Sequence, residues 1–215
     1  MSKYAMLVIL LLLPVHVLAI PPASYLDSAS SNFDYFTAPH WPAGITTVSL
    51  SGAYTQADEQ ILHNIIDDFN YYCIPVDLQY HPFGGNPDIK IMMLPQAQIS
   101  KMYGRESVAG YASFTYNAQN EIVGAICFVS NDRPIYERSI MYHELLHAMG
   151  CMYHSANTDS VLWPYCKNGN LTANDIEAIQ CIYPFWLCPE FQLLLLHLYR
   201  FGKHQPLGNS FHRKI

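Results

Sequence analysis

The residues best suited to chemistry lie in one short stretch that runs from His143 to His154. His143, Glu144 and His147 form an HExxH pattern, and Gly150 follows three residues later. Residues four apart on a helix share a face, so the imidazoles of His143 and His147 can bind one metal ion. Neutral imidazole suits Zn²⁺, and Glu144 stands beside that face, within reach of a metal-bound water. Gly150 would let the chain leave the helix with a positive φ and return a third ligand.

His154 is the first candidate for that third ligand, and Tyr153 directly precedes it. We favour His154 because imidazole binds zinc without first losing a proton. A different kind of HExxH enzyme would use a downstream carboxylate, such as Glu177, in the same place. The sequence therefore predicts one catalytic zinc on His143, His147 and His154, with Tyr153 and Glu177 as alternatives.

The elements that must position these residues follow from the hydrophobic pattern. Alternating or continuous apolar runs predict five strands, over 45–50, 75–80, 89–94, 108–115 and 121–129. Helical spacing and end signals predict three main helices, over 56–70, 136–150 and 172–183, the last with Thr172 as its N-cap. Early strands flanked by helices indicate an α+β fold.

Composition excludes several classes of protein. The chain of 215 residues is 51% hydrophobic and 13% charged, unlike a disordered chain. Its 11 Lys and Arg against 17 Asp and Glu give a net charge of −6, which argues against a nucleic-acid partner. Residues 1–19 have the layout of a secretory signal peptide, with an apolar run too short to span a bilayer. We therefore expect a secreted, monomeric protein with no stable membrane insertion after signal cleavage.

The remaining chain divides into three segments. Residues 20–40 are rich in Pro and Ser, which predicts a short leader or linker. Residues 41–184 contain the predicted strands and helices and the HExxH pattern, so we expect them to form the catalytic domain. Residues 185–215 form a basic, His-containing C-terminal extension. Six cysteines in an oxidising compartment predict up to three disulfides, although Cys127 lies in an apolar run that suits a free thiol. Asn170 begins an N-glycosylation sequon whose Thr172 is also the predicted helix cap.

From His143 to Ser155 the sequence resembles the zinc-binding motif of the metzincin endopeptidases, HExxHxxGxxH. The segment SVLWPY at 160–165 is similar to the Met-turn of the matrixins, the matrix-metalloproteinase branch, and 171–183 is similar to their last helix. Weaker likeness extends from Trp41 to Pro184. The resemblance implies a metzincin/matrixin-like, five-stranded mixed sheet with three main helices and an active-site cleft. It also implies a secreted zinc-dependent endopeptidase that cleaves a protein or peptide substrate by means of a zinc-activated water and Glu144 as general base.

The resemblance also assigns roles outside the motif. Pro164 and Tyr165 would line the pocket for the residue after the cut. The segment 109–112, which contains Gly110 and Tyr111, is either an edge strand that could bind an extended peptide or an ordinary half-buried strand. Tyr111 and Cys127 stand where two histidines of the family's structural zinc would align, so no structural zinc is expected.

Two departures from the family motivate an alternative, a catalytically inactive matrixin-like binding module. The third histidine comes one residue late, and Leu162 replaces the methionine of the Met-turn. Retention of Glu144 argues against that alternative, because an inactive site has no chemical use for its carboxylate. Glu177 lies in the segment that resembles the family's last helix, which disfavours it as a zinc ligand.

Overall fold

The structure, a computed structural model, describes residues 38–183 except 73–74, 83–84, 105–107, 134–135, 153, 166 and 168. The predicted signal peptide, leader up to residue 37 and C-terminal extension lie outside the described residues, as do Tyr153, Cys73, Cys166 and Cys188. The described elements run in the order β1 (Gly44–Gly52), α2 (Gln56–Tyr72), β2 (Val76–Tyr80), β3 (Ile89–Leu94), α3 (Gln96–Tyr103), β4 (Gly110–Tyr116), β5 (Ile122–Ser130), α4 (Glu137–Ala148) and α5 (Ala173–Ile182). No helix among them is long and apolar enough to cross a bilayer.

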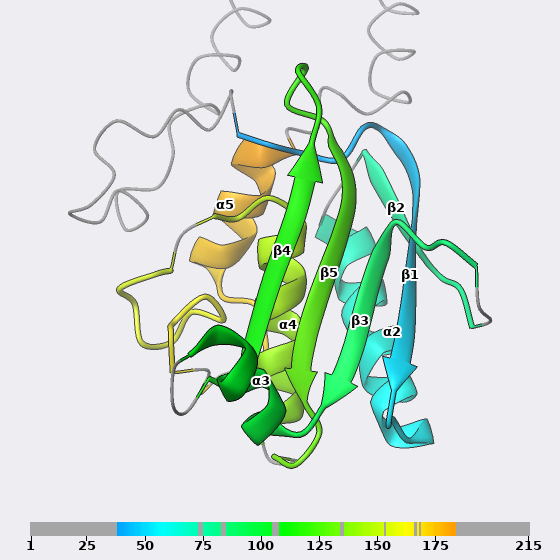
Figure 1. Cartoon of the computed structure of the whole chain (residues 1–215). Coiled ribbons are helices and arrows are strands. Elements are labelled where there is room, and N and C mark those ends of the chain that lie inside the picture. Colours follow the sequence, from blue (N-terminus) through cyan, green and yellow to red (C-terminus); the bar gives the residue numbers. More distant parts are fainter. Residues whose placement is uncertain are drawn as a thin grey trace, which may run out of the picture.

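The five strands form one mixed sheet in the order β2-β1-β3-β5-β4. Three neighbouring pairs are parallel, whereas β4 runs antiparallel to β5 and occupies an edge. Helices α2, α4 and α5 cover one face of the sheet, and α3 lies on the other side, near β4 and β5 (Figure 1). The predicted mixed five-stranded α+β fold is therefore confirmed.

Each predicted element is present, with ends within two residues of those expected. Alternation explains the accuracy in β3, where Ile89, Ile91 and Met93 are buried and the residues between them are not. Periodic burial does the same in α2, where Leu62, Ile65 and Phe69 face the core. The sequence pattern thus reports directly which face each element buries.

The expectation of three main helices is wrong, because the structure has a fourth helix, α3, in its described part. Only Ile99 of α3 is buried, so the segment lacks the apolar period that reveals a helix. Gly104 ends α3 in the left-handed conformation at φ 64°, which is a recognisable C-terminal signal. A stop signal without a hydrophobic stripe was insufficient to predict the element.

Helix α4 packs against β4 and β5 and beside α2, and ten of its 12 residues are buried. Because buried positions occur on all sides of α4, most of its polar residues are shielded from solvent. Among them are His143, which is 3% exposed, and Glu144, which is 5% exposed. Burying a histidine and a carboxylic acid in a core helix costs free energy unless they are paired or functional, so α4 marks the candidate site.

Candidate metal centre

Three histidines meet at the end of α4. The Nε2 atom of His143 lies 3.0 Å from that of His147 and 3.1 Å from that of His154, and the remaining Nε2 pair is 3.4 Å apart. His143 and His147 come from successive turns of α4, whereas His154 comes from the chain that follows it. Within the part of the chain that the structure describes, these three form the one group of His, Cys, Asp or Glu with metal-binding geometry.

The opposite ring nitrogens fix the orientation of two of these imidazoles. Nδ1 of His143 is 2.7 Å from the carbonyl oxygen of Val161, and Nδ1 of His147 is 2.5 Å from that of Cys151. A carbonyl oxygen only accepts hydrogen bonds, so each Nδ1 carries the proton and each Nε2 presents a lone pair. The two rings are therefore held in the tautomer that binds a metal through Nε2.

The three rings also favour their neutral forms. Burial lowers the pKa of His143 to about 3 and the pKa of His147 to about 4, and it lowers the pKa of the more exposed His154. The Nε2 lone pairs of His143 and His147 face each other at 3.0 Å and repel, and a cation bound between them removes this repulsion. The nitrogens bound to a tetrahedral zinc at about 2.0–2.1 Å lie roughly 3.3–3.4 Å apart, close to the separations seen here. The donor set and its spacing thus fit one zinc ion.

Gly150 makes the return of the third histidine possible. Its φ is 99°, and a Cβ atom at this position would lie 2.1 Å from the carbonyl oxygen of Pro39. The turn that it forms is held by the amide of Cys151, which donates to the carbonyl oxygen of Leu146 at 3.1 Å. The conformational requirement predicted for Gly150 is confirmed, and close packing against the N-terminal segment adds a second reason for glycine.

A buried carboxylate holds the segment whose carbonyl orients His143. Asp175 is fully buried, and it accepts hydrogen bonds from the Ser160 hydroxyl at 2.5 Å and the Val161 amide at 3.2 Å. The same side chain completes the capping box of α5, where it accepts from the Thr172 amide and hydroxyl at 2.8 and 2.7 Å. The predicted Thr172 cap is confirmed, but the link from Asp175 to His143 was missed. Only the position of Asp175 three residues after the cap could have suggested it.

The Met-turn-like segment also supports the third histidine. Leu162 is fully buried, and its carbonyl oxygen accepts from the amide of Ser155 at 3.0 Å. Ser155 directly follows His154, so this bond fixes the chain beside that ligand. The Leu162 side chain thus fills a fully buried core position, and its backbone is bonded to the segment that carries His154.

Glu144 lies next to the edge strand β4. Burial raises the pKa of its carboxyl well above the ordinary value. A Cβ atom at Gly110 would lie 2.4 Å from Oε1 of Glu144, so the carboxyl group packs directly against this glycine. Tyr111 faces away from Glu144, because successive side chains of a strand alternate, and it stacks on Tyr103 of α3 at a centroid distance of 3.8 Å. The structure therefore brings Gly110 to Glu144 and turns the Tyr111 ring to the other face.

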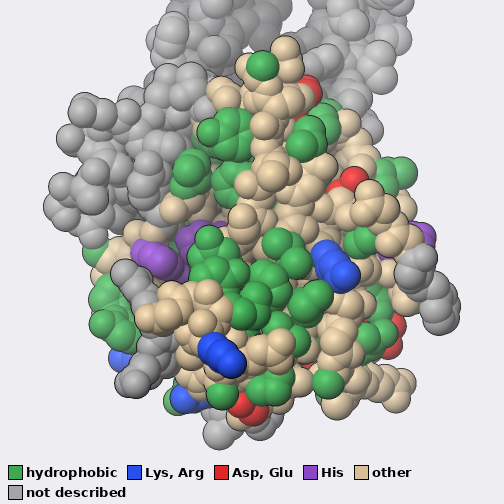
Figure 2. Space-filling model, in the orientation of Figure 1, with side chains coloured by type: hydrophobic (Ala, Val, Ile, Leu, Met, Phe, Trp, Pro, Cys, Tyr) green, Lys and Arg blue, Asp and Glu red, His purple; other side chains and the backbone are tan. Residues whose placement is uncertain are grey.

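The other predicted residues lie near the surface. Tyr165 is 73% exposed, its ring centroid lies 5.6 Å from that of Trp163, and Pro164 between them is exposed as well. Figure 2 shows histidine side chains at the surface beside the edge of the sheet, in keeping with the exposure of His154. The centre is therefore open to solvent on the side of β4.

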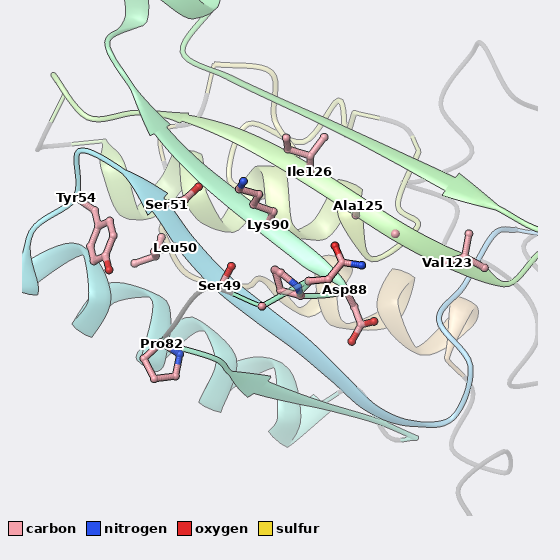
Figure 3. A pocket seen from close by; sticks show the side chains of 14 residues that line it. Ser49, Leu50, Ser51, Tyr54, Pro82, Asp88, Lys90, Val123, Ala125 and Ile126 are labelled. Carbon is pink, nitrogen blue, oxygen red and sulfur yellow. The ribbon is translucent and has the colours of Figure 1, made fainter.

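A separate groove of about 570 Å³ lies on the sheet face opposite α4. Its lining includes Ser49, Ser51 and Lys90 from the outward-facing positions of β1 and β3 (Figure 3). None of the three clustered histidines lines it. The groove is thus distinct from the candidate metal centre.

Cys127, Cys151 and Cys181 are buried free thiols. The free thiol expected for Cys127 is therefore confirmed, whereas the prediction of up to three disulfides is not met by these described cysteines. Cys127 opposes Ala112 in the sheet and faces α4, where its thiol donates to the backbone oxygen of Glu144 at 3.4 Å. Tyr111 and Cys127 consequently lie on opposite faces of the sheet. The absence of a structural zinc stays a prediction.

Neither a family model nor a curated protein matches the sequence. Among solved structures, the chain is similar to myroilysin, with 15% identity, a TM-score of 0.45 and coverage of 68% of this chain and 96% of that one. It is also similar to high choriolytic enzyme 1, a hatching enzyme zinc-protease from the medaka fish Oryzias latipes (12% identity, TM-score 0.41, covering 67% and 94%). Archaemetzincin from Methanopyrus kandleri matches with 13% identity and a TM-score of 0.37, over 75% and 97% of the two chains. All three TM-scores are below 0.5, and the assignment to the matrixins stays a prediction.

Proposed function

We propose that the protein is a zinc-dependent endopeptidase. The observation that carries this proposal is the meeting of three Nε2 atoms within 3.0–3.4 Å, beside the buried carboxyl of Glu144. His143, His147 and His154 would hold the ion. Zinc, when bound there, supplies a Lewis acid that acidifies water and polarises a peptide carbonyl. A purely structural zinc site would be closed by a fourth protein ligand, whereas the described residues supply three histidines and leave one position open.

Glu144 is the general base of this proposal. It follows His143 in α4, and its carboxylate would accept the proton of the attacking water and pass it to the leaving amine. Burial raises the pKa of Glu144, which strengthens its carboxylate as a proton acceptor. Burial lowers the pKa values of His143 and His147, so both rings stay neutral for binding, and the backbone carbonyls that hold their Nδ1 protons leave each Nε2 free for the ion.

The substrate would be an extended protein or peptide segment. Strand β4 is at the edge of the sheet and begins at Gly110, next to Glu144, so its free main-chain groups could pair with such a segment. Gly110 and Tyr111 would supply those main-chain groups. Pro164 and Tyr165 would form the wall of the pocket for the residue after the cut, and their exposure leaves them accessible.

We further propose that residues 41–184 form the catalytic domain of a secreted monomer, after removal of a signal peptide at 1–19. Its mature N-terminus would be Ile20, which N-terminal sequencing of the secreted product from cells expressing the full chain would test. Retention of Met1 would contradict the signal assignment. The absence of a structural zinc would appear as one equivalent of zinc, rather than two, in the purified protein.

The function is tested on that same secreted product. Zinc is measured by elemental analysis, and cleavage of a quenched peptide library is followed with and without chelator. We expect about one zinc per chain and cleavage that is abolished by chelator and by Glu144→Ala. Zinc-loaded protein that cuts no peptide, or protein that binds no zinc, would refute the peptidase and support the inactive binding module instead.

Matched histidine variants assign the ligands. His154→Phe should lose zinc, whereas Tyr153→Phe should retain it. His63→Phe is the control, because the ring of His63 lies against Tyr80 at a centroid distance of 4.7 Å and belongs to α2. Loss of zinc from Tyr153→Phe but not from His154→Phe would reverse the assignment of the third ligand.

A further inference from the structure

The Glu144 carboxyl group packs so close to the backbone of Gly110 that a side chain at residue 110 would collide with it. A Cβ atom built on Gly110 would lie 2.4 Å from Oε1, 2.8 Å from Cδ and 2.8 Å from Cγ of Glu144. All three separations are well below an ordinary carbon contact of about 3.5–4.0 Å. The space that an alanine methyl group would need is therefore filled by the end of the Glu144 side chain.

The two elements that carry these residues cannot easily move apart. The backbone oxygen of Glu144 accepts from the Cys127 thiol on β5 at 3.4 Å, which holds α4 against the sheet. The start of β4 is held by the amide of Ser130, which donates to the carbonyl oxygen of Ala109 at 2.8 Å. An added methyl group would thus have to displace the Glu144 side chain rather than the strand or the helix.

Packing, rather than hydrogen bonding, sets the position of the carboxyl group. Glu144 is 5% exposed, and within the described part of the chain no hydrogen bond to its carboxylate is formed. Its orientation consequently depends on the shape of the surface that Gly110 presents. A change of one methyl group in that surface is enough to move the carboxylate.

We infer that Gly110 is a positioning residue for Glu144, and that its missing side chain is what allows the carboxylate to stand where proton transfer requires it. The inference rests on the proposed peptidase function. A general base must stay within hydrogen-bond reach of the proton it abstracts, and a misplacement of about 1 Å can cost about 100-fold in rate. Alanine keeps the amide and carbonyl of residue 110, so pairing with a substrate strand would be preserved.

The test compares Gly110→Ala with Gly124→Ala in the secreted, zinc-loaded protein. A Cβ atom at Gly124 on β5 would lie 3.7 Å from Oγ1 of Thr115, an ordinary contact, so this variant is the matched glycine control. We expect Gly110→Ala to lower kcat by about 10–100-fold with KM changed less than about threefold. Zinc content and the thermal unfolding temperature should stay those of wild type, and Gly124→Ala should match wild type throughout.

A double variant separates positioning from a general effect on the fold. Glu144→Asp withdraws the carboxylate by one methylene group, so adding Gly110→Ala to that variant should cost less than about threefold, because little remains to be displaced. The same 10–100-fold loss in both backgrounds would overturn the inference. So would wild-type kcat in Gly110→Ala, a loss confined to KM, or a loss of zinc. If wild-type protein itself shows no chelator-sensitive cleavage, the proposed function fails together with the inference, whereas an active wild type with an equally active Gly110→Ala overturns the inference alone.

Discussion

Replacing Asp175 by alanine should both destabilise the fold and weaken zinc binding. The carboxylate accepts four hydrogen bonds from Ser160, Val161 and Thr172, at 2.5–3.2 Å. Buried hydrogen bonds to a charged group contribute about 1.5–3 kcal/mol each, but they are not additive, and the two donors of Thr172 can turn to water. We therefore expect Asp175→Ala to lower the free energy of unfolding by about 3–5 kcal/mol.

The effect on zinc follows from the same contacts. Val161 donates its amide to Asp175 and its carbonyl oxygen accepts from Nδ1 of His143. The Val161 carbonyl shares its peptide group with the Leu162 amide, which donates to the Ser160 hydroxyl oxygen, and Ser160 in turn donates to Asp175. Without Asp175 both peptide groups of Val161 are less firmly held, so the ring of His143 loses its fixed orientation. Loss of such a supporting contact typically weakens metal binding by about 10–100-fold. Asp175→Asn, which keeps one acceptor oxygen, should lie between wild type and Asp175→Ala in both measurements.

Urea unfolding measures the first effect, and competition with a chelator of known affinity measures the second. Unfolding is followed in the presence and absence of chelator, so that stability of the chain is separated from stabilisation by bound zinc. Asp67→Ala is the control, because Asp67 is exposed on α2 and should change stability by less than about 0.5 kcal/mol. If Asp175→Ala behaves like Asp67→Ala in unfolding and binds zinc as wild type does, the proposed route from α5 to His143 is refuted.

Three further predictions concern pH, thiols and the Met-turn. Burial and the neighbouring Asp58 raise the pKa of Glu137 from 4.5 to about 7, so the stabilising contribution of the protonated carboxyl is complete below pH 4.5 and is lost as pH rises to about 7. Glu137→Gln should therefore reduce the fall in unfolding temperature between pH 5 and pH 8, and an unchanged pH profile would contradict this assignment. Burial raises the pKa of the thiols of Cys127, Cys151 and Cys181, to about 11 for Cys181, so these thiols should be alkylated at pH 8 only after unfolding. Rapid labelling of the native protein would contradict this, because it would show that the thiols are accessible. Leu162→Met should change the free energy of unfolding by less than about 1.5 kcal/mol and leave zinc affinity unchanged in chelator competition, because the substitution nearly conserves side-chain volume. A tenfold gain in zinc affinity would contradict the view that the side chain at position 162 serves only to pack the core.

The fold was largely predictable because burial alternates along the chain with the period of each element. Strand β3 was located to the residue, since Ile89, Ile91 and Met93 alternate with less buried neighbours. The strand order β2-β1-β3-β5-β4 was not predicted, because the hydrophobic pattern says which face a strand buries and not which strand pairs with it. The same limit explains why α3, with Ile99 as its one buried residue, escaped detection.

At the site, the side chains were predictable and their supports were not. The spacing of His143 and His147 places both imidazoles on one helix face whatever the rest of the fold does. The groups that orient them are backbone carbonyls of Val161 and Cys151, and a carbonyl is present at every residue of any sequence. Which carbonyl reaches which ring is decided by turns that close only in the folded chain.

The late position of His154 shows what the motif actually constrains. The chain on either side of this histidine is held, at Cys151 by its carbonyl bond to His147 and at Ser155 by its amide bond to Leu162. Metal binding depends on where Nε2 of the third histidine stands, and it stands 3.1 Å from Nε2 of His143. Any length of turn that keeps those two attachments and that separation satisfies the same chemistry. The spacing between Gly150 and the third ligand is thus a property of the turn, and one additional residue does not by itself argue that the site is inactive.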